Sequence, residues 1–138
     1  SFVIPVRDDV ILGCTIHGEA SSETEAVQIR TGQVVLNRVA AHWQPTISSV
    51  CLARRQFDCW DHGTKNRLRV FTDYHNHDVN LMKSIVLAQQ LISGKLHAPE
   101  IKNANMYFVW RTPRPYWAAS PYTLVYKDET NEYWNVPR

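Results

Sequence analysis

Residues 9–41, DVILGCTIHGEASSETEAVQIRTGQVVLNRVAA, decide the fold because they hold two helical patterns in succession. In the first, over about 9–18, apolar residues recur at the spacing of one helix face, and Asp8 or Asp9 can cap its start. The second, over about 22–41, carries a broader apolar stripe, which predicts a central, buried helix. We therefore expect a mostly α protein.

The start of the second helix has a sequence signal of its own. Ser22 and Glu25 fit the S-x-x-E capping box, in which each side chain accepts a hydrogen bond from a free backbone N–H. We therefore place the start at Ser22. The stripe that follows comprises Val27, Thr31, Val34, Val35 and Arg38, widened by Leu36 and Val39.

Glu19 lies at the end of the first helix, on its apolar side. Counted at 100° per residue from Leu12 and Ile16, it continues the apolar stripe. Burial disfavours a charged carboxylate and raises its pKa, so such a group can donate a proton near neutral pH. Cleavage of a glycosidic bond needs a general acid of this kind. The pattern alone fits equally well a glutamate that ends a helix in solvent.

The remaining chain has one more clear helix, over 79–93, with Asp78 as its N-cap and Gly94 as its stop. A short amphipathic segment follows Pro45, residues 54–60 form an irregular loop, and residues 61–76 are polar and basic without a predicted helix. Five prolines beyond residue 98 interrupt an aromatic-rich tail, for which we expect short turns and loops with a small hairpin.

Composition limits the classes of protein. A chain of 138 residues, 44% hydrophobic and 20% charged, fits one catalytic or binding domain over residues 1–138, which we expect to be a monomer. The net charge of +2 does not indicate a nucleic-acid partner. The chain has no apolar run of the roughly 20 residues that a membrane helix needs, and residues 1–5 do not look like a signal peptide. Because the chain begins with Ser1, we expect that upstream sequence is missing.

The cysteines and histidines suggest no cofactor. Cys14, Cys51 and Cys59 allow at most one internal disulfide, for which the last two are closest in sequence, or they are ordinary thiols. Pairing Cys14 with His17, or Cys59 with His62, would suggest a thiol peptidase, but no thiol-peptidase signature surrounds either cysteine. The HNH triplet at 75–77 reads as solvated loop residues, and we predict no metal site.

Motifs along the chain resemble those of the cell-wall hydrolases related to spore cortex-lytic enzymes. The pattern E-A-x-x-E at 19–23 stands at the family spacing from V-V-L-N-R-V at 34–39, without a gap. Further segments that resemble family motifs follow in order: PTISSV at 45–50, RQFDCW at 55–60, ISGK at 92–95, ANMYF at 104–108 and PYWA at 115–118.

The resemblance implies a lysozyme-like helical fold, of the goose-type lysozyme and lytic transglycosylase kind. It also implies cleavage of the β-1,4 bond between N-acetylmuramic acid and N-acetylglucosamine in peptidoglycan glycan strands, usually as a lytic transglycosylase. Matched to the motifs, the general acid is Glu19, with Glu23 and Gln56 in supporting roles. The residues expected to contact the sugar are Phe57, Tyr107 and Trp117.

Two departures from the family pattern leave alternatives open. Asp58 stands where the family has a small residue, and residues 130–134 do not match the family's closing segment. A second carboxylate, Asp58 or Glu23, would make the protein a hydrolytic muramidase instead. A non-catalytic saccharide-binding module is the other alternative. In each case the protein would act on the bacterial cell wall, in the periplasm, in the spore cortex or after release by a phage.

Overall fold

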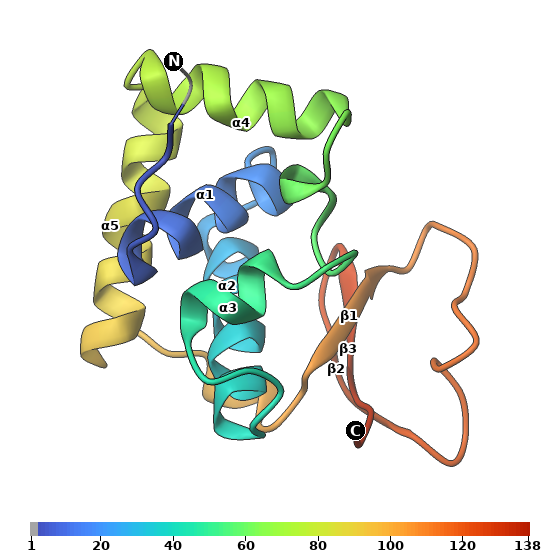
Figure 1. Ribbon diagram of the computed structural model, residues 1–138. Helices are drawn as coiled ribbons and strands as arrows, with labels where there is room; N and C mark the ends of the chain where they lie inside the picture. Colours follow the sequence, from blue (N-terminus) through green and yellow to red (C-terminus); the bar gives the residue numbers. More distant parts are fainter. Residues whose placement is uncertain (1–2) are drawn as a thin grey trace.

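The computed structural model describes residues 3–138, which are mostly helical, with a small antiparallel sheet to one side (Figure 1). Ser1 and Phe2, part of the opening segment in which no signal peptide was expected, lie outside the described residues. Among the residues described, no helix has the length and apolar character that crossing a membrane requires.

Five α-helices are found in the described residues: α1 (Asp8–Ala20), α2 (Glu25–Ala40), α3 (Ile47–Leu52), α4 (Lys65–His75) and α5 (Val79–Ser93). Two single-turn 3₁₀ helices, η1 (Asp58–Trp60) and η2 (Pro99–Ile101), lie in the connections. The strands are β1 (Met106–Val109), β2 (Thr123–Lys127) and β3 (Asn131–Asn135).

The central helix is α1, which corrects the prediction that the second helix takes that place. It contacts α2, α3, α4 and α5, and every residue from Val10 to His17 is buried. The closest approach is to α5: a Cβ atom at Gly13 would lie 2.6 Å from the Cα atom of Ile85. Glycine at this position therefore lets the two helix backbones pack directly together.

The start of α2 differs from the capping box predicted at Ser22. Thr24 is the N-cap, and its hydroxyl accepts a hydrogen bond from the Val27 N–H at 3.3 Å. Residues 21–23 form the turn between α1 and α2, so the helix begins at Glu25. The predicted inward stripe is confirmed, because Val27, Thr31, Val34, Val35 and Arg38 are all buried.

The sequence predicted α5 correctly but did not predict α4, which precedes it. For α5, the predicted bounds, the Asp78 cap and the left-handed Gly94 stop are all confirmed. By contrast, α4 occupies a stretch for which no helix was predicted. Thr64 caps it, and Val70 is its one fully buried residue.

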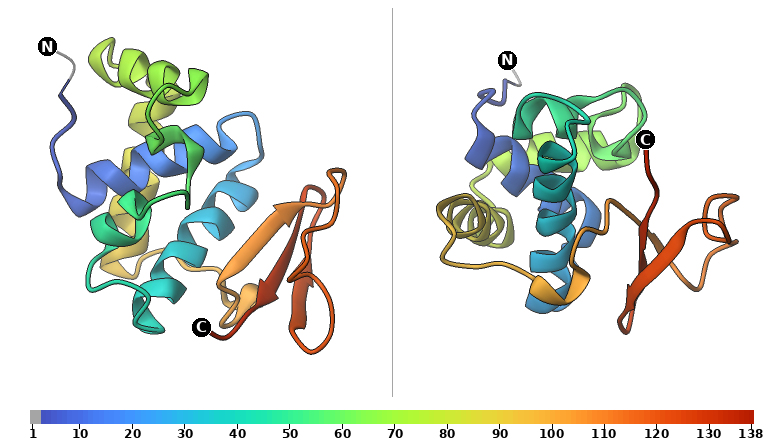
Figure 2. Two further views of the ribbon diagram at one scale, coloured as in Figure 1. Left: turned by 45° about the vertical axis from the view of Figure 1, so that its right-hand side comes forward. Right: turned by 90° about the horizontal axis from the view of Figure 1, so that it is seen from below.

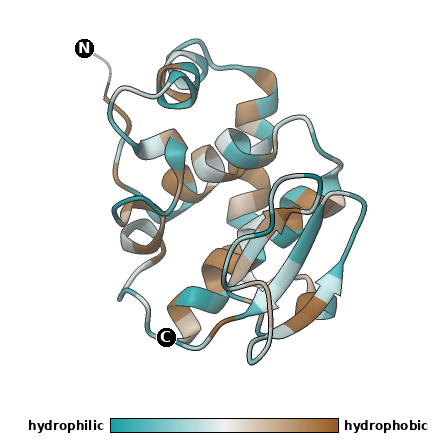
Figure 3. Cartoon of the chain, turned by 90° about the vertical axis from the view of Figure 1, so that its right-hand side faces the viewer, coloured by the Kyte–Doolittle hydropathy of each residue, from teal (hydrophilic) through white to brown (hydrophobic). Residues whose placement is uncertain are grey.

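The sheet follows the order β1-β3-β2 and stands beside the helices (Figure 2). The expected hairpin is confirmed as β2 and β3, and β1 adds a third strand that the sequence did not predict. Tyr107 of β1 lies opposite Tyr133 of β3. A long loop between β1 and β2 projects on the outer side of the sheet, which faces the viewer in Figure 3.

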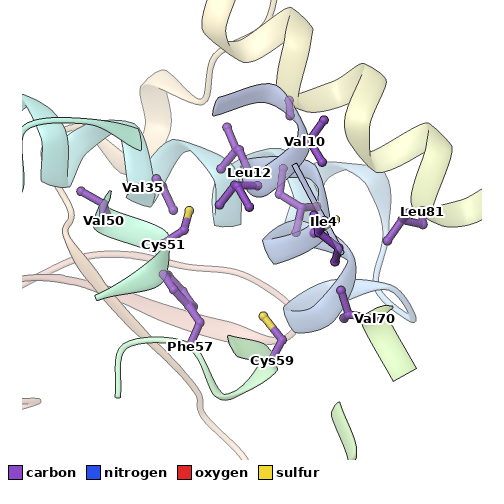
Figure 4. Packing of buried hydrophobic residues seen from close by; sticks show 14 of the residues in the cluster. Ile4, Val10, Leu12, Val35, Val50, Cys51, Phe57, Cys59, Val70 and Leu81 are labelled. Carbon is purple, nitrogen blue, oxygen red and sulfur yellow. The ribbon is translucent and has the colours of Figure 1, made fainter. Parts of the chain in front are cut away.

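The main core lies between α1 and the helices around it. Figure 4 shows Cys51, Phe57 and Cys59 among the apolar side chains of this cluster. All three cysteines are free and buried, so Cys51 and Cys59 form no disulfide here. Phe57 and Cys59, in a segment predicted as an irregular loop, thus anchor the chain in the core on both sides of Asp58.

Candidate active site

Glu19 lies in the last turn of α1, half-buried between the helices and the sheet. The Tyr107 hydroxyl, from β1, donates a hydrogen bond to Glu19 Oε1 at 3.1 Å. Because β1 pairs with β3, the sheet fixes the place of this tyrosine opposite the helix end. The structure thus brings together two residues that the sequence analysis assigned to the site.

The surroundings of Glu19 favour its protonated form. Burial raises its pKa from the usual 4.5 to about 7, although the hydrogen bond from Tyr107 opposes this rise by stabilising the carboxylate. The neighbouring Asp58 raises the pKa further through its negative charge and through hydrogen bonding, whereas the positive charge of Arg38 lowers it. Glu19 can therefore hold a proton near neutral pH, as a general acid must.

Asp58 is exposed and begins η1, a single-turn helix within the segment 54–60 that was predicted as an irregular loop. The Asn66 side chain donates a hydrogen bond to Asp58 Oδ1 at 2.8 Å. The sequence analysis identified Asp58 as a second carboxylate near the cleft, and the structure places it beside Glu19.

Arg38 is a buried guanidinium at the base of the site, with 4% of its surface exposed. It donates hydrogen bonds to the Asn105 carbonyl at 2.7 Å and to Gln56 Oε1 at 3.3 Å, and it lies over the Phe57 ring. Among the described residues it forms no ion pair with a carboxylate. Its position in the apolar stripe of α2 was the sequence signal for a buried charge.

A pocket of about 220 Å³ lies next to this arginine. Gln56 and Trp117, both predicted to be site residues, line it together with Tyr116 and Tyr122. Met106 of β1 also lines the pocket, on the opposite face of the strand from Tyr107. Glu19 does not line this pocket, and the link between them is Arg38, which acts on Glu19 and donates hydrogen bonds to Gln56 and Met106 in the pocket wall.

Two predicted site residues lie elsewhere. Phe57 is 2% exposed and supports Arg38 from the core, so it has almost no surface to offer a sugar, which corrects its assignment to the cleft. Glu23 accepts a hydrogen bond from the Thr130 hydroxyl, and the adjacent Thr24 hydroxyl donates to Glu129 at 3.0 Å. These contacts tie the α1–α2 turn to the turn between β2 and β3.

The three thiols have no environment that favours a nucleophile. Burial raises the pKa of Cys14 and of Cys51 to about 12, and it also raises the pKa of Cys59. The nucleophilic thiolate is therefore disfavoured at all three positions. This counts against the thiol-peptidase alternative.

One group of side chains in residues 3–138, His17, Asp73 and Asp78, has the spacing of a metal site. However, Arg69 Nη1 lies 3.2 Å from His17 Nε2 and 3.7 Å from Asp73 Oδ2. The guanidinium already supplies positive charge to this group, and we assign no metal to it.

Sequence analysis missed the contribution of α4 to the site. Asn66 and Arg69 from this helix reach the end of α1, where both donate to the Gly18 carbonyl, at 2.9 and 3.3 Å. The signals that could have found this helix are the Thr64 cap and the helical spacing of Val70, Phe71 and Tyr74, which pack in or against the main core.

A family model described as Cell Wall Hydrolase matches residues 22–131, most of the chain. The comparisons with curated proteins and with solved structures gave no significant match. Glu19 lies just before the matched stretch, whereas Gln56, Tyr107 and Trp117 lie within it. The match therefore identifies the family without assigning a role to Glu19.

Proposed function

The chain belongs to the Cell Wall Hydrolase family, and we propose that it degrades peptidoglycan by cleaving the β-1,4 bond between N-acetylmuramic acid and N-acetylglucosamine, with Glu19 as the general acid. The observation that carries this proposal is the half-buried Glu19 carboxyl at the end of α1, which accepts a hydrogen bond from Tyr107 and whose pKa burial raises to about 7. We propose further that residues 1–138 act as one catalytic domain of the lysozyme-like type.

The contact with Tyr107 supports a defined position for the transferable proton. Because the phenol donates to Oε1 of Glu19, that oxygen acts as the acceptor, and the proton of the neutral acid resides on Oε2. A glycosidic oxygen within hydrogen-bond reach of Oε2 can then receive this proton as the bond to the sugar carbon breaks.

The pocket on the far side of Arg38 is suited to the sugar rings of the glycan strand. Tyr122 and the edge of Trp117, which is 9% exposed, line it, Gln56 offers an amide, and Tyr116 at 93% exposure stands at the rim. Aromatic rings pack against the apolar faces of sugars while amides bind hydroxyl groups. We propose that this pocket binds one sugar of the glycan strand.

The arrangement of carboxylates favours the lytic transglycosylase route. The two carboxyl groups of a glycosidase flank the sugar roughly 5 to 9.5 Å apart. Asp58 instead stands beside Glu19, where it acts on the acid itself, and Glu23 is engaged with Thr130. Glu19 would therefore act alone, with Asp58 and Glu23 in supporting roles.

In this route Glu19 donates its proton to the leaving oxygen as the bond between that oxygen and the muramyl C1 breaks. The resulting carboxylate then removes the proton from the muramyl 6-hydroxyl, and the C6 oxygen forms a new bond to C1. The product is a 1,6-anhydromuramyl end, and Glu19 returns to its protonated state. No water is consumed.

Hydrolysis is the second candidate, because the exposed Asp58 carboxylate is open to solvent and could activate a water molecule. Mass spectrometry of digested peptidoglycan distinguishes the two routes. We expect anhydro-muropeptides, and products with reducible ends would instead establish hydrolysis.

The role of Glu19 is tested by Glu19→Gln, with the exposed Glu25→Gln as the matched control. Loss of a general acid lowers the rate by about 10²- to 10⁴-fold, so we expect turbidity reduction on cell walls to disappear while binding to sedimented walls remains. The control should lyse walls normally. A wild-type protein that binds walls without lysing them would identify a saccharide-binding module instead.

A further inference from the structure

A chain of hydrogen bonds runs from α4 to the carboxylate beside the candidate acid. Asn66 Nδ2 donates to Asp58 Oδ1 at 2.8 Å and to the Gly18 carbonyl at 2.9 Å. The Asn66 oxygen in turn accepts a hydrogen bond from Arg69 Nη2 at 2.9 Å. All three contacts are satisfied only with the amide in this orientation, because its nitrogen meets two acceptors and its oxygen meets a donor.

Arg69 fixes the same amide to the end of α1. Its guanidinium donates to the His17 and Gly18 carbonyls, both at 3.3 Å, and to the Ser21 hydroxyl at 3.3 Å. These groups lie on either side of Glu19 in the sequence. Arginine side chains commonly satisfy the last carbonyls of a helix, so the backbone that carries Glu19 and the amide that holds Asp58 are parts of one network.

Without this network the Asp58 carboxylate would have little to hold it. The residue is exposed at the start of a single-turn helix, where a side chain turns freely into water. The interaction between two carboxyl groups weakens as they separate and as water comes between them. The effect of Asp58 on Glu19 therefore depends on where its carboxylate is held.

We propose that Asn66, oriented by Arg69, is a positioning residue that holds the Asp58 carboxylate against Glu19 and thereby helps Glu19 to keep its proton for catalysis. This inference rests on the proposed role of Glu19 as the acid. It gives a function to the aspartate that replaces the small residue of the family pattern, and to a helix that the sequence analysis did not predict.

Several groups face Glu19 and set the direction of the expected effect. Tyr107 from β1 and Arg38 from α2 favour the carboxylate, whereas Asp58 from η1 disfavours it. The buried Cys59 thiol also faces Glu19, and its raised pKa keeps it neutral. Loss of the Asp58 charge, or of its position, should therefore lower the pKa of Glu19.

The test is the pH dependence of kcat/KM for lysis of cell walls, which reports the acid of the free enzyme. Three variants are compared with the wild type: Asn66→Ala, Asp58→Asn and the double variant. In Asp58→Asn, we expect the alkaline limb of the pH profile, where activity falls as the acid loses its proton, to move to lower pH by about half a unit. This shift lowers activity at pH 8 relative to pH 5 by about threefold. Asn66→Ala should move it in the same direction, and the double variant should match Asp58→Asn.

Asn80→Ala, an exposed asparagine in the first turn of α5, is the matched control and should leave the limb unchanged. A purely structural role for Asn66 would lower the melting temperature without moving the limb, and that result would overturn the proposal. Shifts that add in the double variant would also overturn it. If Asn66→Ala does not fold, Asn66→Ser takes its place, because serine is too short to bridge both acceptors. The same shift of the alkaline limb is then expected, and an unchanged limb would overturn the proposal.

The proposal and the function on which it rests fail in different ways. If Glu19→Gln still lyses cell walls, Glu19 is not the acid and the proposed function is wrong. If Glu19→Gln is inactive but Asn66→Ala keeps the wild-type limb, the acid stands and the positioning role alone is wrong.

Discussion

Two glutamates of this protein are shielded from water, and their surroundings act in opposite directions. Glu132 on β3 accepts two hydrogen bonds from Arg114, both at 3.0 Å, and a third from the Trp134 indole at 3.0 Å. These contacts lower the pKa of Glu132, and the hydrogen bonds from Arg114 make the largest contribution. Burial instead raises the pKa of Glu19 to about 7.

The difference teaches that the partners of a shielded carboxyl decide its role. Glu132 has a guanidinium aligned with both of its oxygens, so it is a structural anion. Near Glu19, the Arg38 guanidinium directs its hydrogen bonds to Asn105 and Gln56 instead. A phenol is the one hydrogen-bond donor found on Glu19 among the described residues, which leaves the acid ready to carry a proton.

The largest effect is expected when the Glu132 pair is broken. Arg114→Met leaves a buried carboxylate unpaired, and we expect it to lower the free energy of unfolding by about 2–3 kcal/mol at pH 7, less than for a fully buried pair because Arg114 is half-exposed. Chemical denaturation measures this. The pKa of Glu132 is lowered by folding, so its contribution is present above the usual pKa and is lost as pH falls.

The difference between Arg114→Met and the wild type should therefore shrink at pH 3. Arg54→Met is the control, because Arg54 is exposed and forms no ion pair in the part of the chain that the structure describes. An equal loss for both variants would show that the pair with Glu132 contributes nothing of its own.

A smaller effect, of opposite sign, is expected at Glu19. Its pKa is raised by folding, so stability is lost as pH rises from the usual pKa of 4.5 through about 7. Glu19→Gln removes this loss, and we expect it to raise the free energy of unfolding by about 1–3 kcal/mol at pH 8 and by almost nothing at pH 4.

The matched substitution Glu132→Gln should be destabilising at pH 8, because it removes a paired anion. Thermal unfolding of both variants at the two pH values measures the contrast. If both substitutions change stability in the same direction at pH 8, the comparison between the two glutamates does not hold.

The smallest effect is expected at the hydrogen bond on Glu19. The Tyr107 hydroxyl favours the carboxylate, so Tyr107→Phe should raise the pKa of Glu19 and move the alkaline limb of the lysis profile upward by about half a unit. Tyr74→Phe, which removes a hydroxyl from α4, is the control and should leave the limb in place. A limb that moves downward would contradict the account.

Local signals predicted α5 correctly, because its cap, its stripe and its terminating glycine all lie within the helix or directly beside it. For α4 the same approach failed. Val70 alone of this helix is fully buried, Asn66 and Arg69 reach the end of α1 through hydrogen bonds, and apolar Leu68 is 65% exposed. Hydrophobic spacing cannot predict hydrogen bonds such as those of Asn66 and Arg69.

The candidate site was predictable in part for a similar reason. Helical spacing placed Glu19 on the shielded side of α1, and the family motif singled it out. Tyr107 and Asp58, two polar groups that act on it, come from distant segments, and the strand that carries the tyrosine forms by pairing with β3. Spacing within one helix cannot predict contacts of this kind. The resemblance, by contrast, pointed to Tyr107 from outside the helix.

The most direct test of the account is a pH titration of the glutamate side-chain carboxyl carbons by ¹³C NMR, assigned with Glu19→Gln and Glu132→Gln. We predict that the Glu19 carbon titrates near pH 7 and the Glu132 carbon below the usual value of 4.5. A Glu19 carbon that titrates at 4.5 or lower would show that this carboxyl is ionised at neutral pH, and it would contradict the assignment of Glu19 as the acid.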